Sequence, residues 1–350
     1  GDGNAQKMQY LRKTCHSEMK SIMLDLLKSQ NMQRKIKKLL DTLFENQDIK
    51  EITLLLFICN TLTIDIELND ILILLNKQAK SSAVIYNQNI REFFDFRKNR
   101  VEIKSPLVAY YVLKTGKYDR DVEQLLMTVF PVLDRNSYID KYRNALRMLI
   151  SYSNLQMIFG GKGDAVFKRY ERIFEKAKNL NYHKQNPFFW LQYAIVRMEM
   201  KQYKTAGVYL ANAEAYSKKK FNNDSWQIEI NKARLLMEQT MAENNTKDSF
   251  ENFVQAYSLL HESKTVNRFY PFRQVSLFEP YYKQFYDAWG NEEKNVFLLD
   301  TIEMQKSLKK YLDSQAMKNS RNHKRREELR GIVHKLEMMR REMVDKDTQA

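Results

Sequence analysis

Hydrophobic positions follow helical spacing over most of the first third of the chain. Residues 32–44 carry an apolar stripe at that spacing, and residues 49–60 are apolar on nearly every face. These patterns predict two consecutive helices. Asn69 or Asp70 is placed to cap a third, because short polar side chains accept hydrogen bonds from the first free amides of a helix.

The pattern then changes to alternation. Residues 100–104 alternate between polar and apolar side chains, as a half-buried strand does. Ser105 and Pro106 come next, and proline in the first turn favours a helix over residues 107–113. Three helices, a short strand and a further helix are compatible with a winged-helix-like module. The first predicted domain is therefore a helical module over residues 1–115.

After Gly116 the pattern becomes a series of helical hairpins. Residues 138–159 are predicted as one long helix, and the glycines within 160–163 as the turn into a second helix that Asp164 caps. Further helix pairs cover residues 188–219, 226–262 and 281–312. A repeat of about 35 to 43 residues is typical of a helical solenoid. The chain is thus expected to be all-α, with repeats over residues 116–316.

The pair over residues 188–219 resembles a tetratricopeptide repeat (TPR). Its large residues at the matching positions are Trp190, Tyr193 and Leu210, and its small ones are Ala194, Ala206 and Ala213. Small residues let two helices approach closely, and the large ones fill the gap between repeats. The proline that usually follows the second helix is absent, and Lys218 stands near its place. Ordinary helical packing without common ancestry is the alternative.

The order of elements extends this resemblance to a family. A winged-helix-like module, a strand–Ser–Pro–helix element over residues 101–113 and repeats containing the string 186–194 occur here in that order. This order is similar to the region downstream of the nucleotide-binding core in bacterial STAND-type P-loop NTPases, including those of anti-phage defence. The resemblance covers about residues 30–310. It implies a winged helix that carries the switch, repeats that sense a trigger, and a homo-oligomer formed through an NTPase core upstream of this chain.

Composition and charge narrow the class of protein. Nine glycines and five prolines in 350 residues are too few for a β-sandwich, a barrel or a parallel-sheet nucleotide enzyme. No apolar run approaches the roughly 18 residues of a membrane span. Two cysteines do not form a disulfide framework, and no signal peptide is recognisable, so we expect a cytoplasmic protein. The net charge of +15 is spread thinly and is only a weak indication of nucleic-acid binding.

Residues capable of catalysis are sparse. A phosphate loop requires Gly-x4-Gly-Lys-Ser/Thr, and the glycines within 160–163 are followed by no hydroxyl residue and preceded by no strand. The five histidines are scattered and form no zinc pattern with Cys15 or Cys59. We therefore expect neither enzyme activity nor a cofactor or metal in this chain.

Two surfaces are candidates for binding a partner, and the first is the segment 268–289. It interleaves aromatic with basic side chains, which suits a peptide or stacked bases. The candidate partner-binding residues are Tyr270, Phe272, Arg273, Tyr281, Tyr282 and Lys283. At helical spacing most of these aromatic residues are better explained as core between the last repeats.

The second surface is the third predicted domain, a basic amphipathic helix and tail over residues 317–350. Between Lys318 and Arg341 nine basic residues stand against three acidic ones, and an apolar stripe runs through residues 329–343. Such a helix binds phosphates, lies on an acidic membrane surface or packs on a partner helix. The favoured alternative is that it caps the open end of the solenoid. The candidate nucleic-acid contacts are Arg321, Lys324, Arg325 and Arg326.

The sequence therefore predicts a non-catalytic sensor or regulatory region of a STAND-like NTPase. Its TPR-like repeats would recognise a protein or peptide trigger, and no membrane span is expected. The alternative is a stand-alone helical-repeat scaffold that binds nucleic acid through its basic surfaces.

Overall fold

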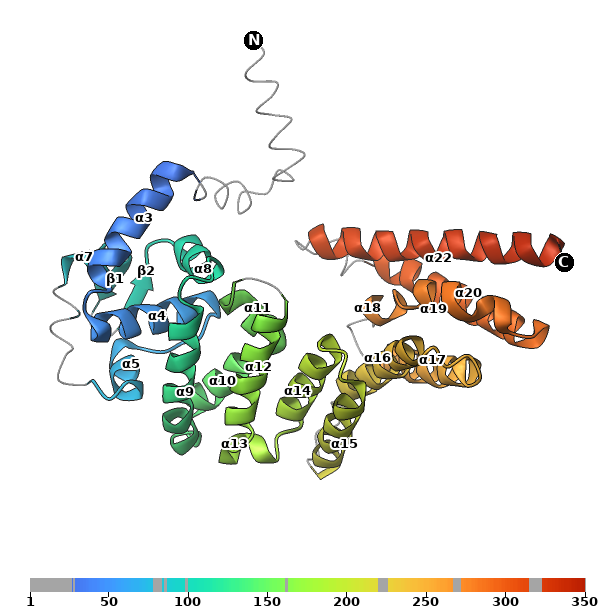
Figure 1. The fold of residues 1–350 in the computed structure, drawn as a ribbon, viewed down its shortest axis with the longest axis horizontal. Coiled ribbons are helices and arrows are strands. Elements are labelled where there is room, and N and C mark those ends of the chain that lie inside the picture. Colours follow the sequence, from blue (N-terminus) through green and yellow to red (C-terminus); the bar gives the residue numbers. More distant parts are fainter. Residues whose placement is uncertain are drawn as a thin grey trace, which may run out of the picture. The chain divides into compact units, whose positions relative to one another are not determined.

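The chain is predominantly helical in the computed structural model (Figure 1). The structure describes residues 27, 29–77, 84, 87–97, 100–160, 163–219, 226–266, 272–314 and 323–349. Two compact units are formed by Gly1–Gln192 and Tyr193–Ala350. The predicted all-α class is thereby confirmed. The predicted domain boundaries after residues 115 and 316 are a different partition and stay predictions.

The first unit contains ten helices and one hairpin among its described residues. These are α3 (Gln30–Leu43), α4 (Gln47–Thr61), α5 (Leu68–Leu74), α7 (Gln88–Arg91), β1 (Phe94–Arg97), β2 (Arg100–Ile103), α8 (Pro106–Lys114), α9 (Asp119–Arg135), α10 (Asp140–Leu149), α11 (Tyr152–Ile158), α12 (Asp164–Ala177) and α13 (Asn181–Lys184). The division between the two units falls within α14 (Pro187–Glu199).

The second unit continues from α14 to the C-terminal helix. Its further elements are α15 (Tyr203–Lys219), α16 (Trp226–Glu243), α17 (Ser249–Val266), α18 (Phe272–Val275), α19 (Phe278–Phe285), the 3-10 helix η2 (Tyr286–Ala288), α20 (Asn291–Leu312) and α22 (His323–Gln349).

Helix α4 lies at the centre of the N-terminal module because its side chains are apolar on nearly every face. Phe57 on α4 is fully buried, and its ring centroid lies 5.7 Å from that of Phe93 and 5.4 Å from that of Phe94. The hairpin is antiparallel and pairs Phe94 with Ile103. Alternation over residues 100–104 was thus a correct signal for β2.

The start of α5 differs from the prediction. The helix begins at Leu68, and Glu67 is its N-cap. Asp70 lies in the first turn, and its Oδ2 accepts a hydrogen bond from the Glu67 amide at 3.0 Å. The same carboxylate accepts hydrogen bonds from Tyr142 Oη at 2.6 Å and Lys141 Nζ at 2.7 Å. Asp70 therefore connects α5 to α10.

The predicted long helix over residues 138–159 is wrong, since the chain breaks between α10 and α11. The amide of Tyr152, which a continuous helix would bond internally, donates instead to Gln192 Oε1 at 2.9 Å. Asn154 Nδ2 donates to the carbonyl oxygen of Met148 at 2.9 Å. A side chain forty residues away thus replaces a helical hydrogen bond, which local periodicity cannot reveal.

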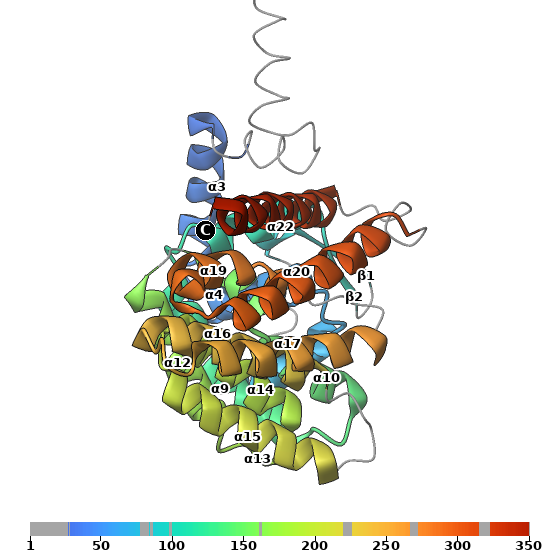
Figure 2. The same cartoon turned by 90° about the vertical axis from the view of Figure 1, so that its right-hand side faces the viewer.

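The core of the second unit is an aromatic cluster around Phe297 of α20. The Phe297 ring centroid lies 4.5 Å from that of Phe253 and 5.2 Å from that of Trp289. Helix α22 packs against α20 and is next to it in both views (Figures 1 and 2). Its apolar stripe is buried in this core through Leu329, Val333, Leu336, Met339 and Met343. The stripe is thus used for packing within the second unit, and the capping role stays a prediction.

Candidate functional site

The turn between α8 and α9 meets the end of α11 backbone to backbone. Gly116 in this turn has φ +71°, a conformation that L side chains rarely adopt. A Cβ on Gly160 would lie 2.4 Å from the carbonyl oxygen of Lys114 and 2.6 Å from the amide nitrogen of Gly116. Only glycine fits at position 160. We call this contact and the polar groups around it the joint.

Ion pairs hold the first turns of α9 to α12. Arg169 Nη1 lies 2.9 Å from Asp119 Oδ2, and Arg169 Nε lies 3.2 Å from Glu123 Oε2. Arg172 Nη2 donates to Glu123 Oε2 at 2.8 Å, and the Gly160 amide donates to Asp119 Oδ1 at 3.4 Å. The side chains of Arg169, Asp119 and Glu123 are mostly buried. Removing one partner of such a pair is strongly destabilising, because it leaves a buried charge unpaired.

The pKa values of the two carboxylates of the joint shift in opposite directions. Burial raises the pKa of Asp119, and the positive charge of Arg169 offsets this only in part. Burial also opposes ionisation of Glu123, but its hydrogen bonds and charge interactions with Arg172 and Arg169 lower the pKa of Glu123 overall.

Lys114 completes the joint at the end of α8. Its ammonium group donates to the carbonyl oxygens of Gln156 and, at 3.3 Å, Phe159. Burial lowers the pKa of Lys114, and the charge of Asp119 acts in the opposite direction. A cation at the C-terminal end of a helix interacts favourably with its free carbonyl groups. Sequence reasoning treated 160–163 only as a hairpin turn and missed this role of Gly160.

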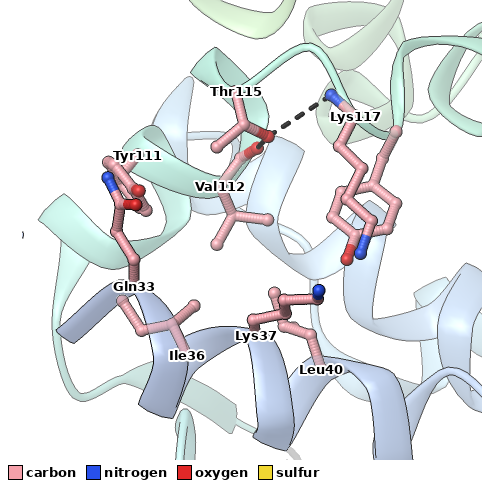
Figure 3. Close-up of a pocket in the computed structure, with 9 residues that line it drawn as sticks. Gln33, Ile36, Lys37, Leu40, Tyr111, Val112, Thr115 and Lys117 are labelled. Carbon is pink, nitrogen blue, oxygen red and sulfur yellow. Dashed lines mark hydrogen bonds between the residues drawn. The ribbon is translucent and has the colours of Figure 1, made fainter. Parts of the chain in front are cut away.

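The α8–α9 turn also lines a pocket of about 340 Å³ (Figure 3). Three segments supply its lining: Gln33, Ile36, Lys37 and Leu40 of α3, Tyr111 and Val112 of α8, and Thr115, Lys117 and Tyr118 of the turn. Thr115 Oγ1 accepts from the Lys117 amide at 3.3 Å and donates to the Val112 carbonyl at 2.7 Å. The turn is therefore held in place on the pocket side as well.

The charged side chains that line this pocket are two lysines, Lys37 and Lys117. Lys117 Nζ lies 3.1 Å from Asp41 Oδ1 and 5.1 Å from the ring centroid of Tyr118. Contact with Tyr118 and Asp41 raises the pKa of Lys117. Lys37 is exposed and has no ion pair with any residue that the structure describes. No acidic residue is among the nine that line the pocket.

The predicted partner-binding residues of the second unit separate into two groups. Tyr281 and Tyr282 are 0% and 2% exposed, and Tyr281 Oη donates to the carbonyl oxygen of Ser249 at 2.6 Å. Both belong to the core, because α19 turns this face toward α16 and α22. Their assignment to a partner-binding surface is therefore wrong, and the core interpretation that their helical spacing favoured is correct for these two residues.

The remaining members of that set are exposed or lie outside the description. Arg273 is 77% exposed and lies 3.8 Å from Glu328, and Lys283 is 64% exposed and lies 2.8 Å from Glu279. Tyr270 and the side chain of Phe272 lie outside the described part of the chain.

The predicted nucleic-acid contacts are only partly described. Arg321 and the side chain of Lys324 lie outside the described residues. Arg325 and Arg326 are half-buried on α22, and Arg325 Nη2 donates to Tyr311 Oη at 3.4 Å. Exposed cations further along α22 are paired with carboxylates, as Lys335 is with Glu279 at 2.8 Å.

The described residues show neither a metal-binding cluster nor a membrane-spanning helix. They contain no group of three or more His, Cys, Asp or Glu side chains arranged to hold a metal ion. Among them, no helix has both the length and the apolar character needed to cross a membrane.

Comparison with protein-family models, with curated proteins and with solved structures finds no match to this chain.

Proposed function

We propose that this chain is the sensor and regulatory region of a STAND-like NTPase. In this proposal the module from α3 to α8 is winged-helix-like and the hairpins after it are TPR-like. The repeats recognise a protein or peptide trigger, and the module relays its binding to a nucleotide-binding core outside this chain. The region is cytoplasmic and non-catalytic, and oligomers form through that core.

The joint is the observation that carries the proposal. Backbone contact of Gly160 with Lys114 and Gly116, together with the Arg169–Asp119 ion pair, leaves little freedom between α8 and the α11–α12 hairpin. A trigger shifts an equilibrium only by binding one arrangement more tightly than another. Rigid attachment of α11 and α12 to α8 would transmit such a shift to the module.

The TPR-like interpretation is supported by α14 and α15. Ala194, Ala206 and Ala213 are fully buried, as small residues at a close helix–helix contact should be. The rings of Tyr193 and Tyr209 stack with centroids 4.5 Å apart. Trp190 is only half-buried and donates to the Lys184 carbonyl at 3.0 Å, so it does not fill a gap as the repeat pattern would have it.

The first test is the reading frame upstream of residue 1. A continuous frame that encodes Gly-x4-Gly-Lys-Ser/Thr supports the proposal, because this loop holds nucleotide phosphates. In that longer protein, Gly160→Leu should reduce trigger-dependent nucleotide turnover without changing basal turnover. Gly331→Ala is the control, since a Cβ there meets nothing within 4 Å. A frame without the motif overturns the STAND assignment.

A nucleic-acid-binding scaffold is the second candidate. It predicts RNA or DNA binding that weakens steeply with salt, because phosphate contacts release counterions. Arg326→Glu should then weaken binding, and Glu251→Gln, an exposed position on α17, should not. Salt-independent binding or none at all removes this candidate.

A further inference from the structure

We propose that the pocket between α3 and the α8–α9 turn binds a small apolar acid. Its hydrocarbon part would lie against Ile36, Leu40 and Val112, with its anionic group between the ammonium groups of Lys37 and Lys117. This site lies apart from the repeats to which trigger recognition is assigned above, so it does not depend on that function.

The size and lining of the pocket suit such a molecule. A volume of about 340 Å³ falls within the range of small-ligand sites, which are mostly apolar with a few placed polar groups. In Figure 3, Ile36 and Leu40 on α3 point toward Val112 on α8. These three side chains are buried, and they form an apolar wall that excludes water from a bound hydrocarbon chain.

The charges of the pocket select an anion. In the view of Figure 3 the ammonium groups of Lys37 and Lys117 lie at one end of the pocket, opposite Gln33 and Tyr111. Lys117 uses one N–H on Asp41, and an ammonium group has three N–H donors, so donors remain for a ligand. Asp41 does not line the pocket, but its carboxylate offsets the charge of Lys117, so Lys37 supplies the net positive charge that an anion would meet.

The same charges disfavour other ligands. A cation would be repelled by the net positive charge of Lys37, Lys117 and Asp41. A neutral molecule of the same length would forgo charge-assisted hydrogen bonds, which are about twice as strong as neutral ones. An anion, a neutral molecule and a cation of the same chain length should therefore bind with different affinities because of their charge alone.

Calorimetric titration of the full chain with octanoate tests the site. Octanamide and octylammonium serve as neutral and cationic probes of the same chain length. We expect saturable octanoate binding at one site and no octylammonium binding. Octanamide should bind with an affinity at least about tenfold lower than that of octanoate. Octanoate should also raise the melting temperature, because a ligand that binds only the folded state stabilises it.

Variants locate the binding. Lys37→Gln combined with Lys117→Gln should weaken octanoate binding about tenfold and leave octanamide unchanged. Gln33→Trp, at an exposed position on the rim, should block both probes by filling the pocket. Lys38→Gln is the control, because Lys38 is exposed on the same helix and does not line the pocket.

Three results would overturn the proposal. They are equal affinity for octanoate and octanamide, an equal loss in Lys38→Gln, and the absence of saturable binding. If the double variant unfolds, Gln33→Trp decides the matter, since unchanged octanoate binding in that variant places the ligand elsewhere.

Discussion

The joint of the first unit and the core of the second hold helices together by different means. At the joint, contact depends on a missing side chain at Gly160 and on oriented ion pairs such as Arg169–Asp119. In the second unit, large rings around Phe297 and the apolar stripe of α22 share a continuous apolar core. The joint is therefore directional and sensitive to small additions, whereas the core is sensitive to loss of volume.

Removing the central ring of the core should have the largest effect. Phe297→Ala is expected to cost about 3–5 kcal/mol of unfolding free energy, because it deletes a fully buried aromatic side chain and leaves a cavity. Urea denaturation measures this loss of free energy. Hydrogen exchange should also become faster in peptides of residues 193–350.

The matched control lies on the same helix. Leu299 is 65% exposed, so Leu299→Ala should change stability by no more than about 0.5 kcal/mol. A comparable loss in both variants would mean that Phe297 is not central to the core.

Adding one methyl group should damage the joint. Gly160→Ala is expected to cost about 1–3 kcal/mol, since the new Cβ meets backbone atoms that cannot move independently. Hydrogen exchange should increase in peptides from α8, α9 and α12. Gly331→Ala, in the open on α22, is the control and should be neutral or slightly stabilising, because alanine is the better helix former. A stable Gly160→Ala protein with unchanged exchange would contradict the described contact.

The buried carboxylate of Asp70 links pH to stability. Burial opposes its ionisation, but hydrogen bonds from Lys141, Tyr142 and the Glu67 amide lower the pKa of Asp70 overall. Asp70→Asn should therefore cost about 1–3 kcal/mol at pH 7.

The direction of the pH effect follows from the lowered pKa. The Asp70 contribution is present above the unfolded-state pKa of about 3.9 and is lost as pH falls through the lower native value. The difference in unfolding free energy between wild type and Asp70→Asn, measured by urea denaturation, should therefore become smaller at acidic pH. A difference that is constant from pH 7 to pH 3 would show that the carboxylate charge is not the cause.

The smallest effect is expected at His183. Its ring is fully buried and stacks on Phe189 with centroids 4.9 Å apart, and neither ring nitrogen has a hydrogen-bond partner among the residues that the structure describes. Burial lowers the pKa of His183 to about 4. His183→Phe should therefore stabilise the chain by about 1 kcal/mol at pH 7, because it removes an unsatisfied buried polar group.

The stabilisation by His183→Phe relative to wild type should increase as the pH falls. The unfolded histidine takes up a proton near pH 6.5 while the native one does not until about pH 4, so wild-type stability declines between these values. Thermal melts of wild type, His183→Phe and the exposed-site control His334→Gln measure the effect. If the melting temperatures of wild type and His183→Phe changed equally with pH, His183 would not be buried in its neutral form.

Local pattern was a good guide to single elements. Apolar spacing predicted α3 and α4 to within about two residues, and alternation over residues 100–104 predicted β2. The stripe of residues 329–343 predicted the face of α22 that is buried. For the candidate site the sequence was less informative, because neither the pocket nor the joint has a local motif.

By itself the sequence therefore determined the helical class and most element positions, since periodicity and capping act over a few residues. Only tertiary structure decided the break before Ser151 and the need for glycine at 160. Each depends on a group distant along the chain: the Gln192 amide oxygen and the Lys114 carbonyl. Spacing along the chain shows which face of a helix is apolar, and three-dimensional packing determines what that face meets.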